Sequence, residues 1–136
     1  MIMSICDRVA LVVAERHSKH TCVTASVDSM HFLQPAGQGD ILLVSAAINH
    51  AWRTSMEIGV KVEAEHYKTG EVRHILSAYF TFIALDDNRK PTEVPPVLPE
   101  TPIEKRRYQE ADERRERRKK EAEERKRKRS TFSLKE

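Results

Sequence analysis

The chain has 136 residues and a mean hydropathy of −0.61, and 33% of its residues are charged. This length predicts a single domain, and the apolar run at its start is shorter than the roughly 20 residues that a bilayer-spanning helix needs. Two cysteines provide neither a disulfide framework nor a metal motif, so the sequence favours a cytoplasmic protein over a membrane-embedded or disulfide-rich secreted one.

The first predicted element is a helix, because Leu, Val, Ile and Ala cover nearly every side of residues 2–14. We therefore expect this helix to be buried. Four strands are predicted next from their Val, Ile and Thr content and their alternation, over residues 21–30, 41–49, 55–64 and 72–85. Turn residues separate them, most clearly at 35–40 and 68–71. The pattern predicts an α+β fold in which an antiparallel sheet wraps around one helix.

After residue 90 the chain changes character. Residues 91–103 hold five prolines, which predicts an extended strap over a surface. Residues 104–129 contain neither Pro nor Gly and hold 14 Lys and Arg against 8 Asp and Glu. Their Glu-before-base pairs at i,i+4 predict a solvated helix without a coiled-coil seam. The domain layout expected is thus 1–90 as the folded domain, 91–103 as the strap and 104–136 as a charged helical tail.

The basic tail raises the question of nucleic-acid binding. Acidic residues are interspersed along the tail, and its most basic run, residues 125–129, has no aromatic residue for stacking, so we expect no specific nucleic-acid partner and no membrane partner. A weak attraction to anionic surfaces, or to the phosphates of a ligand, stays open.

Asp7 is the leading candidate for a functional residue, because it is a carboxylate inside the apolar first helix. Such a group costs several kcal/mol when buried without compensation, and a chemical task is one reason to keep it. Two other interpretations are open: an ion pair with Arg8 or another base, or a position at a partly solvated helix edge.

Metal and cofactor chemistry are not expected. The six histidines are scattered, and no pair has a zinc-type spacing with a third ligand. The sequence also lacks a nucleophile elbow and a phosphate-cradling Gly-rich loop.

Several sequence blocks, in order along the chain, together resemble one protein family. They include Asp7-Arg8-Val9-Ala10, Val23-Thr24-Ala25-Ser26, Arg53-Thr54-Ser55-Met56-Glu57-Ile58, Ala78-Tyr79-Phe80-Thr81-Phe82 and Val94-Pro95-Pro96. With these blocks the chain resembles the cytosolic acyl-CoA thioesterases of the hotdog fold. The resemblance implies hydrolysis of acyl-CoA to free acid and CoA, at a site between subunits of a homodimer or homohexamer.

The resemblance also implies roles for four residues. Asp7 matches the family's catalytic acidic residue on the central helix, where a carboxylate deprotonates water or attacks the carbonyl. Thr54 and Ser55 match a Thr-Ser segment near the reacting end, with ordinary strand hydroxyls as the alternative. Arg53 is the candidate for contact with a CoA phosphate.

One departure from the family pattern concerns the start of the chain. Family members carry an upstream strand and a loop with an Asn and a His-Gly-Gly segment before the central helix, and Met1 falls where that loop would end. This departure keeps a second function class open: a non-catalytic hotdog module that assembles, or binds CoA, without turnover.

Overall fold

The computed structural model describes the backbone of residues 2–32 and 34–135 and the side chains of 2–28 and 34–130. The chain forms two compact units, residues 1–98 and residues 99–136. The first unit contains the helix α1 (Ile2–Ser18) and the strands β1 (Thr21–Phe32), β2 (Ile41–Ala51), β3 (Ser55–Glu65) and β4 (Val72–Leu85). None of the helices in the described part of the chain is long and apolar enough to cross a bilayer.

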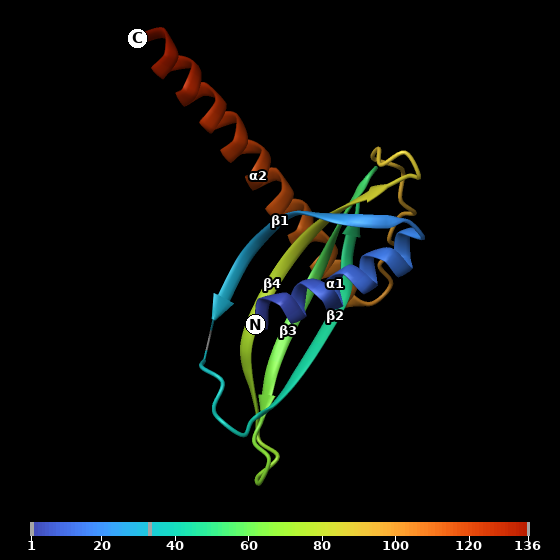
Figure 1. Ribbon diagram of the computed structural model, residues 1–136, viewed down its shortest axis with the longest axis vertical. Coiled ribbons are helices and arrows are strands. Elements are labelled where there is room, and N and C mark those ends of the chain that lie inside the picture. The colour runs from blue at the N-terminus through green and yellow to red at the C-terminus, as the bar shows by residue number, and fades with distance from the viewer. Residues whose placement is uncertain (1, 33, 136) are drawn as a thin grey trace. The chain divides into compact units, whose positions relative to one another are not determined.

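The four strands form one antiparallel sheet in the order β1-β4-β3-β2, and α1 lies across one of its faces (Figure 1). This is the helix-and-sheet arrangement of the hotdog fold, and it confirms the predicted α+β class. The strands begin where the sequence predicts them to begin, and β1, β2 and β3 end one or two residues later than predicted. Both β1 and β2 are edge strands of this sheet.

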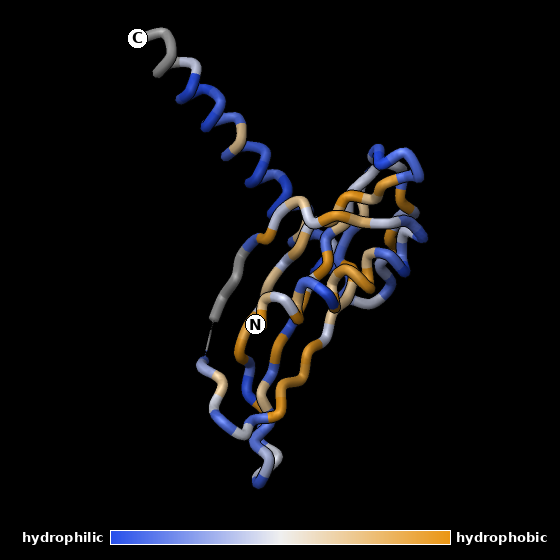
Figure 2. The backbone as a smooth tube through the Cα atoms, in the orientation of Figure 1, coloured by the Kyte–Doolittle hydropathy of each residue, from blue (hydrophilic) through white to orange (hydrophobic). Residues whose placement is uncertain are grey.

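The core lies between α1 and the sheet. Alternate residues of β3 and β4 face the helix, and their apolar side chains are buried: Met56, Ile58, Val60, Val62, Ala64, Leu76, Ala78, Phe80, Phe82 and Ala84. Figure 2 shows the corresponding alternation of apolar and polar residues along the strands. Burial of apolar area at about 25 cal/mol per Å² is the main stabilising contribution to such a layer.

The prediction that α1 is buried rather than half-solvated was wrong for this chain. Its buried residues are Cys6, Ala10, Ala14 and Ser18, which are spaced four apart and so form one stripe. Their small side chains let the helix approach the sheet closely. Ile5 and Val12 lie on the opposite side of the helix and are 41% and 55% exposed. An apolar sequence alone does not reveal which side of a helix its own chain covers.

The strap is held by a single bridge, two main-chain hydrogen bonds and one histidine side chain rather than by a continuous strand pairing. Leu85 and Pro91 form an isolated bridge, the N–H of Thr92 donates to the carbonyl of Ala84, and the N–H of Val94 donates to the carbonyl of Arg53. His17 Nε2 lies 2.7 Å from the carbonyl oxygen of Pro95. The strap thus contacts the end of β4, the turn before β3 and the last turns of α1.

The second unit is dominated by the helix α2 (Pro102–Lys135). It begins earlier than predicted because Thr101 and Glu104 form a capping box, with Glu104 N–H donating to Thr101 Oγ1 and Thr101 N–H donating to Glu104 Oε1. Pro102 occupies the first helical position, where its missing N–H is tolerated. These hydrogen bonds with Thr101 lower the pKa of Glu104.

Most side chains of α2 that the structure describes are exposed, as predicted for a solvated helix, and Figure 2 shows its residues to be almost uniformly hydrophilic. A stripe in the first half differs. Ala111 is fully buried, and Tyr108, Arg114, Arg115 and Arg118 are half-buried.

Candidate active site

Asp7 lies on the side of α1 that faces the sheet, next to the stripe of small residues. Its side chain is half-buried, and its Oδ1 accepts a hydrogen bond of 2.9 Å from the hydroxyl of Thr24 on β1. A hydroxyl donor holds a carboxylate in a fixed orientation without neutralising it. The helix edge, rather than an ion pair with Arg8, is therefore the better description of the position of Asp7.

The register of the sheet explains why the Thr24 hydroxyl points at the helix. Thr24 pairs with Phe82, and Phe82 pairs with Met56, so the three residues share one rung and one face. Phe82 and Met56 are buried in the core against α1, and directly paired residues of antiparallel strands point to the same side. Thr24 thus faces α1 at an edge of the sheet.

The three other predicted site residues lie around the turn between β2 and β3. The turn is closed by Trp52 N–H, which donates to the carbonyl of Ser55, and its position is fixed by Ala84 N–H, which donates to the carbonyl of Thr54. Arg53 is exposed, and Thr54 and Ser55 are half-buried.

Within one chain the structure does not bring Ser55 to Asp7. Ser55 pairs with Ile83, and Ile83 pairs with Val23. These three residues are each one position away from the paired residues Thr24, Phe82 and Met56. Because successive residues of a strand point to opposite faces, their side chains point away from α1.

The ionisable groups near α1 include two thiols. Burial raises the pKa of both the Cys6 and the Cys22 thiol, and Cys22 Sγ lies 3.3 Å from Ser18 Oγ. Neither thiol has the lowered pKa of a catalytic nucleophile. Among the described residues, no group of three or more His, Cys, Asp or Glu side chains could hold a metal ion.

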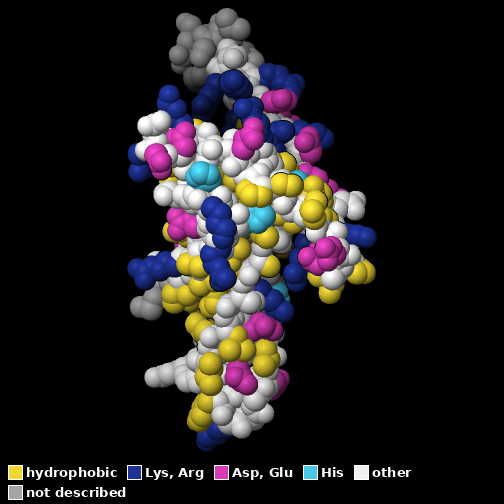
Figure 3. Space-filling model, turned by 90° about the vertical axis from the view of Figure 1, so that its right-hand side faces the viewer, with side chains coloured by type: hydrophobic (Ala, Val, Ile, Leu, Met, Phe, Trp, Pro, Cys, Tyr) yellow, Lys and Arg dark blue, Asp and Glu magenta, His cyan; other side chains and the backbone are white. Residues whose placement is uncertain are grey.

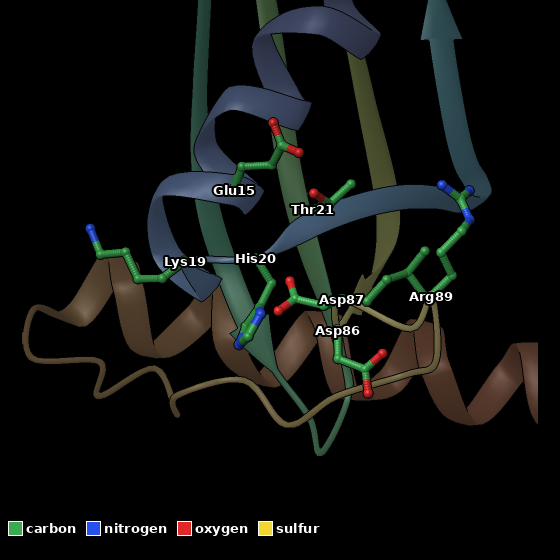
Figure 4. Close-up of a pocket in the computed structure, with 8 residues that line it drawn as sticks. Glu15, Lys19, His20, Thr21, Asp86, Asp87 and Arg89 are labelled. Carbon is green, nitrogen blue, oxygen red and sulfur yellow. The ribbon is translucent and has the colours of Figure 1, made fainter.

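A hollow lies at the other end of α1, where the turn into β1 meets the turn after β4. Figure 4 shows its lining, which comprises Glu15, Lys19, His20, Thr21, Leu85, Asp86, Asp87 and Arg89. Two of its acids are already used by main-chain donors: Glu15 accepts from Cys22 N–H, and Asp86 accepts from the N–H groups of Asn88 and Lys90. With Leu85 as its one apolar residue, this hollow is unsuited to an acyl chain.

Comparison with known proteins places the fold in a family. The model of the thioesterase superfamily matches residues 1–71. The chain belongs to the thioesterase superfamily. Its relatives include the uncharacterized acyl-CoA thioester hydrolase YkhA of Bacillus subtilis (strain 168), which is 44% identical over 100 residues, or 74% of this chain and 58% of YkhA. This thioesterase-superfamily chain thus spans less than two thirds of the length of that relative.

Solved structures agree with the family assignment. An apo-hexameric acyl-CoA thioesterase superposes with a TM-score of 0.85 at 39% identity, covering 89% of this chain and 78% of the other. The acyl-CoA hydrolase of Staphylococcus aureus, in complex with butyryl coenzyme A, coenzyme A and coenzyme A disulfide, has a TM-score of 0.85 at 37% identity, covering 97% and 80%.

Thr24, which contacts Asp7, is a candidate site residue that the sequence analysis did not single out. Alanine variants of the Staphylococcus aureus enzyme have been solved for one aspartate and for one threonine, which are 17 positions apart in that protein. Asp7 and Thr24 are also 17 positions apart. A hydroxyl residue at the start of the strand that follows the Asp-bearing helix was the available signal, but a sequence pattern does not show which strand residue reaches back to the helix.

Proposed function

We propose that this protein hydrolyses acyl-CoA thioesters to a free carboxylic acid and CoA, with Asp7 as the general base. The observation that carries the proposal is the Asp7–Thr24 pair: a half-buried carboxylate whose Oδ1 is fixed by a hydroxyl, in a chain of the thioesterase superfamily. The Staphylococcus aureus relative, which binds butyryl coenzyme A, supports the substrate class.

The proposed reaction needs few groups because a thioester is already activated. With Oδ1 held by Thr24, Oδ2 of Asp7 takes a proton from a water molecule while the water oxygen attacks the thioester carbonyl carbon. The tetrahedral intermediate collapses, the C–S bond breaks, and the proton returns from Asp7 to the departing CoA thiolate. General-base assistance of this kind contributes typically about 10²–10⁴ in rate.

The proposed site is completed by a second copy of the chain. Exposed apolar side chains occur on α1, at Ile5 and Val12, and at the start of the edge strand β2, at Ile41, Leu42 and Leu43. Figure 3, which views the molecule from its β2 side, shows apolar side chains at the surface among charged ones. Free strand edges with apolar residues favour pairing, and the hexameric relative supports a homodimer or a hexamer.

In such an assembly we propose that Arg53, Thr54 and Ser55 act in the site of the neighbouring copy. Arg53 is exposed on a turn and is proposed to bind a CoA phosphate, while the two hydroxyls lie near the reacting end. The proposed layout keeps 1–90 as the catalytic domain, 91–103 as the strap and 104–136 as the tail. The proposed compartment is the cytoplasm, which is supported by two free cysteines.

The test measures CoA release from acyl-CoA substrates of increasing chain length. Asp7→Asn should lower kcat by about 10²–10⁴ with little change in KM, because the lost group acts on the transition state. Thr24→Val, which removes only the hydroxyl, should lower kcat by about 10-fold to 150-fold, the equivalent of one hydrogen bond to a charged group. Asp87→Asn, an exposed carboxylate outside the pair, is the matched control.

Full activity of Asp7→Asn would overturn the catalytic assignment. If the unaltered protein binds CoA but hydrolyses none of the substrates, the proposal of an enzyme is wrong and the non-catalytic module is favoured. The assembly is tested by light scattering at micromolar concentration, where a mass near 15.7 kDa would contradict it.

A further inference from the structure

Within residues 105–129, the helix α2 has one face that carries only basic charge. Successive residues of an α-helix are rotated by about 100°, so sequence positions translate directly into sides of the helix. A sector of roughly 140° collects eight basic residues: Arg107, Arg114, Arg115, Arg118, Lys119, Arg125, Lys126 and Arg129. Within residues 105–129, whose side chains are all described, the seven acidic residues lie outside this sector.

The acidic residue Glu104 does fall in the sector, but it is engaged in the capping box with Thr101. The opposite side of α2 mixes seven acids with six bases and is nearly neutral. A helix that used its charges only for i,i+4 pairs would not need to exclude acids from one side. The segregation therefore indicates a surface that attracts anions.

The accessible part of this sector is its second half. Ala111 is buried and Arg114, Arg115 and Arg118 are half-buried, whereas the residues from 119 to 129 are all exposed. We define the distal basic face as Lys119, Arg125, Lys126 and Arg129. Lys119 has an exposed contact of 4.0 Å with Glu116, which is worth little in water. Figure 3 shows Lys and Arg side chains dominating the visible surface of α2 that is drawn in colour.

We propose that the distal basic face binds the phosphate backbone of duplex nucleic acid without sequence preference. Four cations on one side of a helix can each neutralise a phosphate, and Arg binds phosphate oxygens with two N–H groups. The apolar residue among the described part of this face is Ala122. It offers neither an aromatic ring for stacking a single strand nor a large apolar side chain for entering a bilayer.

The test follows the binding of a short fluorescent DNA duplex of arbitrary sequence by anisotropy. Neutralising four phosphates gives a slope of about −3.6 for log K against log salt, or about a 150-fold loss of affinity between roughly 50 and 200 mM salt. The triple variant Arg125→Gln, Lys126→Gln, Arg129→Gln keeps one cation of the face. Its affinity should fall only about threefold to fourfold over the same range.

The matched control is Arg117→Gln, Lys120→Gln, Lys128→Gln, which removes the same charge from the mixed side of α2. These residues are also exposed, and the control should keep the salt slope of the unaltered protein. Circular dichroism at 222 nm shows whether α2 stays helical in both variants.

Four outcomes would overturn the proposal: no binding at the lower salt, an affinity that does not change with salt, equal losses of affinity in the two triple variants, or binding to anionic phosphatidylserine vesicles without binding to the duplex. A mass change in the first variant alone, measured by light scattering, would also overturn it, because the face would then serve contacts between copies of the chain. Neither triple variant changes a residue of the proposed catalytic site, so we expect both to keep any acyl-CoA hydrolysis of the unaltered protein, and this test is independent of the proposed enzymatic function.

Discussion

Gly59→Ala is a sharp test of how the sheet accommodates a buried carboxylate. Glu57 on β3 is fully buried on the side of the sheet turned away from α1, and its Oε2 accepts a 3.0 Å hydrogen bond from Asn49 Nδ2. Asn49 itself is 4% exposed. A Cβ atom at position 59 would lie 2.8 Å from that Nδ2 atom, which is closer than real Cβ contacts come. The added methyl group therefore has to displace the amide of Asn49.

The expected cost combines two effects. Overpacking a filled site costs about 1–3 kcal/mol, and weakening a hydrogen bond to a charged group accounts for a similar amount, about 1.5–3 kcal/mol. Part of this cost is offset by the lower chain entropy of Ala in the unfolded state, about 0.4–1 kcal/mol. We expect Gly59→Ala to lower the free energy of unfolding by about 2–5 kcal/mol, or the melting temperature by roughly 4 °C per kcal/mol.

The assay is urea denaturation at one fixed protein concentration, because assembly makes stability depend on concentration. In an Asn49→Ala background the displaced amide is gone, so adding Gly59→Ala should cost little or even stabilise. The coupling energy of this double-mutant cycle should therefore be about as large as the cost of Gly59→Ala in the unaltered protein. Gly70→Ala is the control: it has open space but a φ of +73°, so its cost should be the same in both backgrounds. Equal costs of Gly59→Ala in both backgrounds would refute the argument.

Two further predictions concern ionisable groups. Burial raises the pKa of the Cys6 and Cys22 thiols. Both should therefore react slowly with a disulfide reagent at pH 8 in the native protein and at once in denaturant. Fast labelling of the native protein would show that the buried side of α1 becomes exposed to solvent. The N–H of Gly37 and then the guanidinium of Arg73 lower the pKa of Asp40 below its ordinary value of 3.8. Their stabilisation is therefore present above pH 3.8 and is lost as the pH falls through the folded-state pKa, so urea titrations in acid should find a flatter acid limb in Asp40→Asn than in the unaltered protein.

The strands were predictable from the sequence because each carries its own signal. Apolar and polar residues alternate over residues 55–64, and turn residues follow at 68–71. Both signals come from residues that are neighbours in the sequence, and the structure has β3 and β4 on the two sides of this turn. The start of α2 was missed for a local reason: Pro102 was interpreted as part of the strap, although proline is common at the first helical position after a capping residue such as Thr101.

What the sequence could not supply depends on contacts between distant elements. The side of α1 that is buried is decided by which of its residues contact the sheet. The sequence does not reveal this side, because the exposed Ile5 and Val12 are as apolar as buried residues are. The Asp7–Thr24 hydrogen bond joins a helix to a strand across 17 positions, a separation that neither the helical nor the strand period encodes. The roles of Asp7, Thr54 and Ser55 stay predictions until variants are assayed.

The position of Asp7 combines two properties that a hydrolytic carboxylate needs. It lies beside the small residues Ala10 and Ala14 on the sheet side of α1, so the helix runs close enough to the sheet for a short side chain to reach a strand hydroxyl. The strand it reaches is β1, an edge of the sheet, and the carboxylate is therefore half-buried rather than sealed in the core. A central strand would have provided the same orientation but no route for water or for a thioester. Close packing orients the carboxylate, and the sheet edge leaves it accessible to water, as the proposed reaction requires.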